Sequence, residues 1–521
     1  MLIEVVSLSF AFVFGLLVRQ IGLPPLVGFL AAGFALNSYG PVFGLPPQAG
    51  PFLEHVAHLG VLLLLFTVGL KLKLKNLVEP AVIGGAILHF VFSVSLFALG
   101  ILYFLELDYQ TALLLAAALA FSSTVLAAKV LEAKGELRSF HGRVAIGILI
   151  LQDLIALFVL SAAGEHKPSV WALGVIALPL LRPVLHWLMD VAGHEELLVL
   201  MGVVLAVAIG GYGFEVVGLS AEVGALAMGV LLSGHPRAQE LSHSLWGLKE
   251  ILLVGFFLQI GMSGLPDYNA LVFALVMALV MPLKGILFFA LLALFRLRAR
   301  NAFLGALSLT CYSEFGLIVA AAVLPQWLVP LAITMALSFL IAAPLNRLAH
   351  PIFDRFENIL RRYERRSYHP DEQPVSIGMA QVLVVGMGRT GQAAFKAVDS
   401  GGLRVVGMDA DPDKVEKQRD KGRNVVYADA EDIELWQGLD FTGLHAVILT
   451  MPHLEGKIIA ARNLRKMGFN GPIVANVFHE DEPQPLHRAG VSETYQAMAG
   501  AGIGIADKTR EAIRLADVSA I

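Results

Sequence analysis

The stretch "GLPPLVGFLAAGFALNS" (22–38) returns later in the chain as "GLSAEVGALAMGVLLSG" (218–234). The two copies share Gly, Leu, Val, Gly, Ala, Gly and Leu in register, and each is followed by a similar segment, "LLFTVGLKL" (64–72) and "GFFLQIGMS" (255–263). Self-similarity over two successive blocks indicates that one structural unit occurs twice. The sequence therefore predicts a fold built from two related halves.

The composition places these halves in a membrane. Of the 521 residues, 57% are hydrophobic and only 15% are charged, which excludes a disordered chain and an ordinary soluble enzyme. The charges are also unevenly distributed, because the stretch from 356 to 440 is dense in Arg, Lys, Asp and Glu. Residues 1–350 contain only four aspartates: Asp108, Asp153, Asp190 and Asp267. We expect a membrane domain followed by a water-soluble tail.

The membrane domain is predicted to cross the bilayer thirteen times, because an apolar segment of about 17–25 residues is long enough to span it. The predicted spans lie near 2–18, 24–38, 54–70, 78–104, 110–132, 139–163, 169–188, 194–213, 219–234, 246–262, 268–294, 301–323 and 326–348.

The loops between these spans predict the orientation. Those on one side carry nearly all the basic residues: Arg19, Lys71, Lys73, Lys75, Lys134, Arg138, Arg237, Arg296, Arg298 and Arg300. The loops on the other side offer Lys167 alone. The positive-inside rule then places the amino terminus outside and the tail in the cytoplasm, which requires an odd number of spans.

The repeated copies begin at the second and ninth spans, so they enter the membrane from opposite sides. Such an inverted-topology repeat is the construction of many secondary transporters. The alternative is that small-residue packing motifs recur in any membrane helix bundle.

Two predicted spans at equivalent places in the repeat have polar interruptions, "AFSSTVLAAK" (120–129) and "LTCYSEFGLIV" (309–319). Their polar side chains are Ser122, Ser123, Thr124, Ser313 and Glu314. Hydroxyl groups and freed carbonyls can replace water around a hard cation, so the pair predicts an ion site. Alternatively, Ser and Thr bond back to their own helix.

A carboxylate lies in the middle of another apolar run, "ILILQDLIALFVL" (148–160), although Asp costs a membrane helix roughly 2.5–3.5 kcal/mol. Its neighbour Gln152 cannot titrate near neutral pH, so Asp153 is the single ionisable group of the pair. One carboxylate holds either a proton or a monovalent cation, K⁺ or Na⁺, and competition for it predicts one-for-one, electroneutral exchange. Lys284, in "VMPLKGILFF", is also at mid-span depth. It either belongs to the ion site or forms a structural ion pair with Asp153 or Glu314.

The tail begins with an ordered nucleotide-binding pattern. The strand "VLVV" (382–385) leads directly into Gly386-x-Gly388-x-x-Gly391, a helix, and a second strand ending at Asp409. Such glycines let backbone N–H groups approach phosphate at a helix start, and the acid binds ribose hydroxyls. The alternative is that the fold persists without a ligand.

The pattern continues with a third strand before Asp429 and a fourth at 446–451, which predicts a Rossmann-like α/β domain. The arginine-rich stretch before it predicts a helix lying on the anionic inner leaflet. The expected domains are therefore a transmembrane domain (1–349), a basic cytosolic linker (350–379) and a nucleotide-binding regulatory domain (380–521).

The whole chain resembles Kef-type potassium/proton antiporters of the cation:proton antiporter-2 family, with a cytosolic TrkA-N-like domain of the kind that regulates potassium conductance. The matching stretches are "FSSTV", "LQDLIAL", "GLSAEVGALAMGVLLS", "FFLQIGMS", "SEFGLIVA" and "VVGMGRTGQ" with "DADPDKV". The sequence departs from the family at Lys71, where an acidic residue is usual, and in the loop 235–250, which is less acidic than in glutathione-gated members.

This resemblance implies a homodimer of the sodium/proton-antiporter fold in the cell inner membrane, with a dimerisation domain and a moving core domain. It implies no nucleic-acid partner and no catalytic cofactor. Asp153 would carry the ion and the proton, with Gln152 as its neighbour. AMP or NAD(H) would be a regulatory ligand held by Gly386, Gly388, Arg389, Gly391, Asp409 and Asp429.

The leading hypothesis is nucleotide-regulated, electroneutral potassium/proton antiport. Sodium/proton exchange on the same scaffold is the first alternative, because one carboxylate and several hydroxyls do not fix cation size. A ligand-gated potassium channel is less favoured, because the chain has no "TVGYG"-like filter. An oxidoreductase is disfavoured because the tail shows no second substrate domain, and a dinucleotide fold alone does not establish hydride chemistry.

Overall fold

The computed structural model describes residues 2–43, 50–71, 79–134, 136–137, 139–163, 177–365, 369, 376–431, 435–436 and 439–519. The chain divides into two compact units, one formed by Met1–Val130 with Val144–Glu364 and the other by Leu131–Arg143 with Arg365–Ile521. Lys73, Lys75, Arg138, Lys167 and the first part of the predicted span 169–188, up to residue 176, lie outside the described residues.

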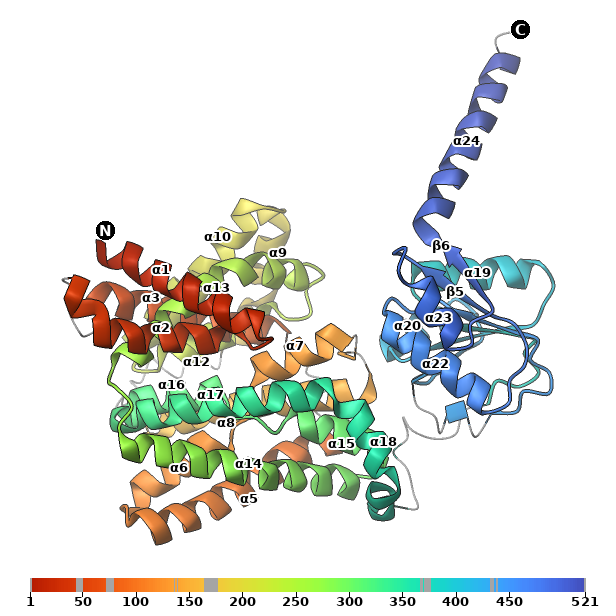
Figure 1. Cartoon of the computed structure of the whole chain (residues 1–521). Coiled ribbons are helices and arrows are strands. Elements are labelled where there is room, and N and C mark those ends of the chain that lie inside the picture. The colour runs from red at the N-terminus through yellow and green to blue at the C-terminus, as the bar shows by residue number, and fades with distance from the viewer. Residues whose placement is uncertain are drawn as a thin grey trace. The chain divides into compact units, whose positions relative to one another are not determined.

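The first unit is entirely helical in its described part (Figure 1). The chain up to the end of α8 forms α1 (Leu2–Gln20), α2 (Pro25–Tyr39), the 3₁₀ turn η1 (Gly40–Phe43), α3 (Pro51–Lys71), α5 (Pro80–Leu105), α6 (Tyr109–Ala120), α7 (Thr124–Lys134) and α8 (Phe140–Ala163). The last four residues of α7 and the first four of α8 belong to the second unit. The first unit then continues with α9 (Arg182–Ala192), α10 (Glu196–Val204), the π-helical η3 (Leu205–Tyr212), α11 (Gly213–Val216), α12 (Ala221–Leu232), α13 (Ala238–Met262), α14 (Tyr268–Leu294), α15 (Ala299–Ser308), α16 (Glu314–Val323), the 3₁₀ turn η4 (Pro325–Trp327) and α17 (Leu328–Arg347).

Within the described residues, seven helices are long and apolar enough to cross a membrane, and four shorter apolar helices accompany them. Two predicted spans are not continuous helices. The span 110–132 is broken between α6 and α7, and the span 301–323 is broken between α15 and α16, in both cases at the polar interruption. Where the predicted span 169–188 ends, the structure has the shorter amphipathic helix α9.

Glycines allow the repeated segments to approach one another closely. A Cβ atom added to Gly33 of α2 would lie 2.8 Å from the Cα atom of Gly261 in α13. A Cβ atom added to Gly69 of α3 would lie 2.9 Å from the Cα atom of Gly229 in α12. These four helices therefore pack backbone against backbone, as small residues permit in membranes.

The helices of the first unit form two groups (Figure 1). Helices α1, α2, α3, α12 and α13 pack on one another, while α5, α6, α14, α15, α16 and α17 form the second group. After α17 the chain continues through α18 (Ala349–Leu360) and the 3₁₀ turn η5 (Arg361–Tyr363), in the stretch where the sequence predicts a basic linker.

The second unit contains a six-stranded parallel sheet with strand order β3-β2-β1-β4-β5-β6. Its strands are β1 (Val382–Val385), β2 (Val405–Asp409), β3 (Val425–Tyr427), β4 (Ala446–Leu449), β5 (Ile473–Val477) and β6 (Glu493–Gln496). Its helices are α19 (Arg389–Ser400), α20 (Pro412–Arg419), α22 (Leu454–Lys466), α23 (Pro483–Arg488) and α24 (Ala497–Ser519). The four predicted strands are present, and β5 and β6 extend the sheet beyond them.

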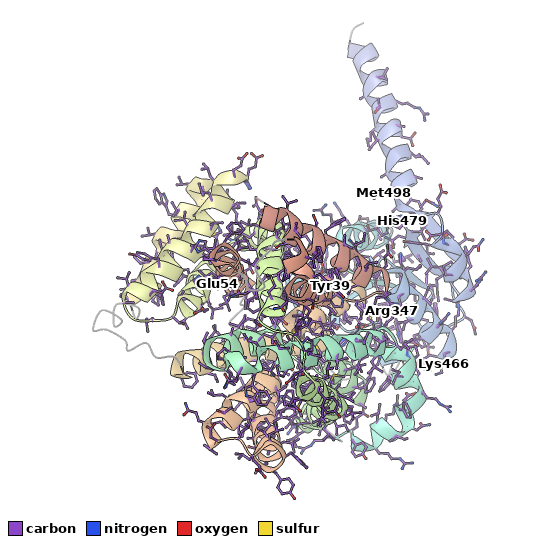
Figure 2. All side chains as sticks on the ribbon, turned by 60° about the vertical axis from the view of Figure 1, so that its left-hand side comes forward. Tyr39, Glu54, Arg347, Lys466, His479 and Met498 are labelled. Carbon is purple, nitrogen blue, oxygen red and sulfur yellow. The ribbon has the colours of Figure 1, made fainter. Side chains whose placement is uncertain are left out.

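Alternate residues of β1 enter two separate cores, as expected for a sheet covered on both faces. Leu383 packs in the core that includes Leu464 of α22, whereas Val384 packs in the core that includes Phe395 of α19. Helix α24 stands away from this sheet, and Figure 2 shows Met498 at its foot. Every residue from 501 to 510 is exposed.

Candidate ion-binding and nucleotide-binding sites

The two helix breaks cross each other inside the membrane unit. Ser122, between α6 and α7, forms an antiparallel bridge with Tyr312, between α15 and α16. Helix α8 passes the crossing, and Gln152 Oε1 accepts a hydrogen bond from the Ser122 backbone N–H at 3.0 Å. Broken helices expose backbone groups that the bilayer cannot solvate, so protein side chains or a bound ion must satisfy them.

Lys284 of α14 binds the carbonyl ends of both broken helices. Its Nζ atom donates to the carbonyls of Phe121 and Leu119 at the end of α6, the latter at 3.4 Å. The Cys311 carbonyl, after α15, lies 3.5 Å from the same nitrogen. A helix carboxyl end carries partial negative charge, so an ammonium group at this position is stabilising.

Of the two alternatives for Lys284, the ion pair with Asp153 or Glu314 is not found among the described residues. Within the described part of the chain, the buried ammonium has carbonyl partners and no carboxylate partner. The physical reason is the crossing, which brings freed carbonyls of two helices to one point and satisfies a cation without a second buried charge.

Glu314 lies on the other side of the two breaks, at the amino ends of α7 and α16. It is the first residue of α16, its Oε2 accepts from Ser123 Oγ at 2.8 Å, and its Oε1 accepts from the Val125 N–H at 3.4 Å in α7. Ser313 caps α16 by accepting from the Phe315 N–H at 3.0 Å. A carboxylate near two helix amino ends is favourable for the same electrostatic reason that places Lys284 at the carboxyl ends.

Asp153 is buried in α8 beside this arrangement, with 1% of its surface exposed. Thr124 Oγ1 lies 3.1 Å and 3.3 Å from its two carboxylate oxygens. The Gln152 Nε2 and Ser122 Oγ atoms are buried without a hydrogen-bond partner in the described structure. The structure therefore brings every predicted residue of this group to one crossing, rich in the oxygen ligands that hard cations prefer.

The sequence reasoning missed His89, a buried residue of α5 next to the crossing. Its ring stacks on Phe288 of α14 with centroids 3.4 Å apart, and its Nε2 lies 3.2 Å from Ser93 Oγ. The available signal was a histidine four residues before a serine in an apolar span, which places both on one helix face.

In the second unit, the glycine loop follows β1 as predicted. Gly386 has φ +93°, a left-handed conformation that favours glycine. A side chain on Gly391 would overlap the Gly386 carbonyl and lie 2.7 Å from Thr450 Oγ1. Gly388 immediately precedes α19, and Arg389 is the exposed first residue of that helix. The loop thus places backbone N–H groups at a helix amino end, where phosphate binds.

Asp409 ends β2 and holds the glycine loop. Its Oδ2 accepts from the Met387 N–H at 2.7 Å, and its Oδ1 accepts from the Asp411 N–H at 2.9 Å. Lys414 Nζ lies 3.4 Å from Oδ2. A carboxylate oxygen accepts more than one hydrogen bond, so the group retains capacity for hydroxyls. Asp429, just beyond β3, is half-buried at the same edge of the sheet and accepts from the Glu431 N–H at 3.0 Å.

Comparisons with known proteins identify the family of each unit. Residues 8–346 match the family described as "Sodium/hydrogen exchanger, transmembrane", and residues 382–496 match the TrkA-N domain. The sodium proton antiporter MjNhaP1 of Methanocaldococcus jannaschii has the same fold in its membrane part. It is 15% identical with a TM-score of 0.51, and the match covers 69% of this chain and 98% of that one. The fold and these matches define a multi-pass membrane protein of the secondary antiporter class.

The curated relatives indicate a narrower group of antiporters for this chain. The "Glutathione-regulated potassium-efflux system protein KefC" of Salmonella schwarzengrund and that of Salmonella typhi are each 29% identical over 518 residues, covering 93% of this chain and 81% of theirs. The chain belongs to the sodium/hydrogen exchanger family, as a cation/proton antiporter of its cation:proton antiporter-2 branch with a regulatory TrkA-N domain. It is a transporter and not an enzyme, which removes the oxidoreductase alternative.

Proposed function

We propose that the protein exchanges potassium for protons, one for one, across the inner membrane, with Asp153 as the group that both ions share. The observation that carries this proposal is a buried carboxylate beside Thr124 at a crossing of two broken helices. Deep ionisable residues in membrane proteins mark transport pathways. Because Gln152 cannot titrate, the proton and the cation compete for one charge, and the exchange carries no net charge.

The other polar groups would shape the site. Ser123, Ser313 and Glu314 supply further oxygens near the crossing, and Thr124 is the hydroxyl closest to Asp153. Lys284 fixes the negative ends of the broken helices without using a carboxylate, so Asp153 stays available to the transported ions.

We favour potassium over sodium as the transported cation because the curated relatives, which match nearly the whole chain, are named as potassium-efflux proteins. Sodium/proton exchange is the second candidate, favoured by the fold shared with a sodium proton antiporter. Hydroxyl and carboxylate oxygens bind both cations, so a direct comparison of the two ions decides between them.

We also propose the inverted repeat and the thirteen-span topology, with the tail in the cytoplasm. The glycine contacts support the repeat. Gly33 and Gly229 occupy the same position of the repeated segment. Gly33 contacts Gly261, and Gly229 contacts Gly69, so each contacts a glycine in the following segment of the other copy. Two helix breaks meeting at one antiparallel bridge support it too.

The tail is proposed to bind AMP or NAD(H) as a regulatory ligand, with the phosphates on the loop from Gly386 to Gly391 and the ribose on Asp409. The left-handed Gly386 and the loop–helix arrangement support this proposal. A homodimer is proposed as well. The fully exposed stretch 501–510 of α24 supports it, because an unpacked helix gains stability by covering its apolar residues.

The test of the transport proposal compares Asp153→Asn with Asp267→Asn in proteoliposomes. Asp267 caps α14 by accepting from the Ala270 N–H, and Asn caps equally well, so this matched variant should transport normally. Asp153→Asn should abolish cation-driven proton movement, and the unaltered protein should generate no current on a solid-supported membrane. Normal exchange by Asp153→Asn overturns the carrier assignment, and a potential-dependent current overturns the one-for-one stoichiometry.

A further inference from the structure

A small, largely enclosed cavity lies between the two helix groups of the membrane unit. Its walls come from α2, α3 and α13 on one side and from α7 and α16 on the other. Most of the lining is apolar, including Leu64, Phe256 and Phe257. The lining contains two carboxylates, Glu250 of α13 and Glu314 of α16.

Glu250 lies at the middle of α13, near the start of the predicted span 246–262. It is twelve residues from either end of the helix, which corresponds to about 18 Å at 1.5 Å per residue. Only 22% of its side chain is exposed. A carboxylate that lines a mostly apolar cavity is costly to keep ionised without a cation.

The partner that Glu250 has in this structure is the buried ammonium group of Lys249. Lys249 Nζ lies 3.1 Å from Glu250 Oε1, and 10% of the Lys249 side chain is exposed. The two residues are adjacent on one helix, and the Lys249 ammonium also interacts electrostatically with the Glu314 carboxylate of α16. A monovalent cation in the cavity would take the place of this ammonium beside the two carboxylates.

The cavity shares Glu314 with the site already described. Glu314, on its other wall, accepts a hydrogen bond from Ser123, and the next residue, Thr124, contacts Asp153. Carboxylates on opposite walls of a low-dielectric cavity attract cations strongly and repel anions.

We propose that Glu250 is a transient binding site for the transported monovalent cation, which displaces Lys249 there before it passes to Glu314 and Asp153. This inference rests on the proposed function and adds an access step on one side of the carrier group. The competing explanation is a structural ion pair that only neutralises two buried charges.

The test measures cation dependence separately on the two faces of oriented proteoliposomes, with K⁺ and then Na⁺. Glu250→Gln should raise the KM for the cation at least about fivefold, a loss of roughly 1 kcal/mol of binding, on one face only and with little change in kcat. Glu250→Asp should restore most of the affinity. Glu240→Gln, on the same helix and outside the cavity, is the matched control.

Lys249→Gln provides an independent measurement if Glu250→Gln folds poorly. Removing the competing ammonium should lower the KM on the same face. Unchanged KM values on both faces in these variants, or equal changes on both faces, would overturn the access site. Asp153→Asn in the same vesicles separates the two proposals: its inactivity beside a normal Glu250→Gln removes only the access site, whereas its activity removes the proposed function.

Discussion

The hydrogen bond from Ser123 to Glu314 joins the two broken helices, and its removal has a calculable cost. In Ser123→Ala, the Glu314 carboxylate loses a donor at 2.8 Å, and the Leu126 N–H in the first turn of α7 loses its acceptor at 3.2 Å. A hydrogen bond to a charged group contributes about 1.5–3 kcal/mol, and a helix cap contributes about 1 kcal/mol. The free energy of unfolding should therefore fall by about 2.5–4 kcal/mol.

A double-mutant cycle isolates the interaction between the helices. Ser123→Ala, Glu314→Ala and the double variant are unfolded by denaturant in the same micelles, and the coupling energy is expected to be about 1.5–3 kcal/mol. Ser95→Ala is the matched control. The exposed Ser95 hydroxyl bonds only to the Val91 carbonyl of its own helix, so its loss should change stability by no more than about 0.5 kcal/mol. Additive effects of the Ser123 and Glu314 substitutions would refute the proposed connection.

Two further predictions concern the nucleotide site and the repeat. Asp409→Ala should weaken AMP or NADH binding by at least about tenfold in calorimetry, a loss of about 1.4 kcal/mol, and should remove the nucleotide response of transport while basal exchange persists. The exposed Asp420→Ala is its control, and normal binding by Asp409→Ala would show that the site is misplaced. Gly33→Ala should lower stability by about 1–3 kcal/mol, because its Cβ would lie 2.5 Å from the Leu258 carbonyl oxygen. Gly100→Ala, with open space around its Cβ position, should not lower it, and equal stabilities of the two variants would count against the close packing.

Much of the ion site could be predicted from the sequence because its residues violate the pattern around them. Ser123 and Glu314 interrupt apolar spans, and a carboxylate such as Asp153 is energetically costly inside a membrane helix. Each can therefore be recognised from the sequence alone. The first strand and its glycines were predictable for a similar reason, since strand, tight turn and helix follow one another directly in the chain.

The partners of Lys284 could not be predicted, because they are main-chain carbonyls, which every residue possesses. Only the crossing of two distant helix breaks selects those of Leu119, Phe121 and Cys311. Strand β6 was missed because three of its four residues are exposed at the sheet edge, so it lacks the apolar run that marks a buried strand.

The close glycine contacts carry an evolutionary consequence. When an ancestral gene is duplicated, the two copies are free to drift apart except where geometry forbids it. A Cβ atom on Gly33 or Gly229 would collide with the main chain of the other half, so any side chain at either position lowers stability. In the proposed repeat, the two copies are therefore held alike at these joints, where a side chain would meet the main chain of the other half.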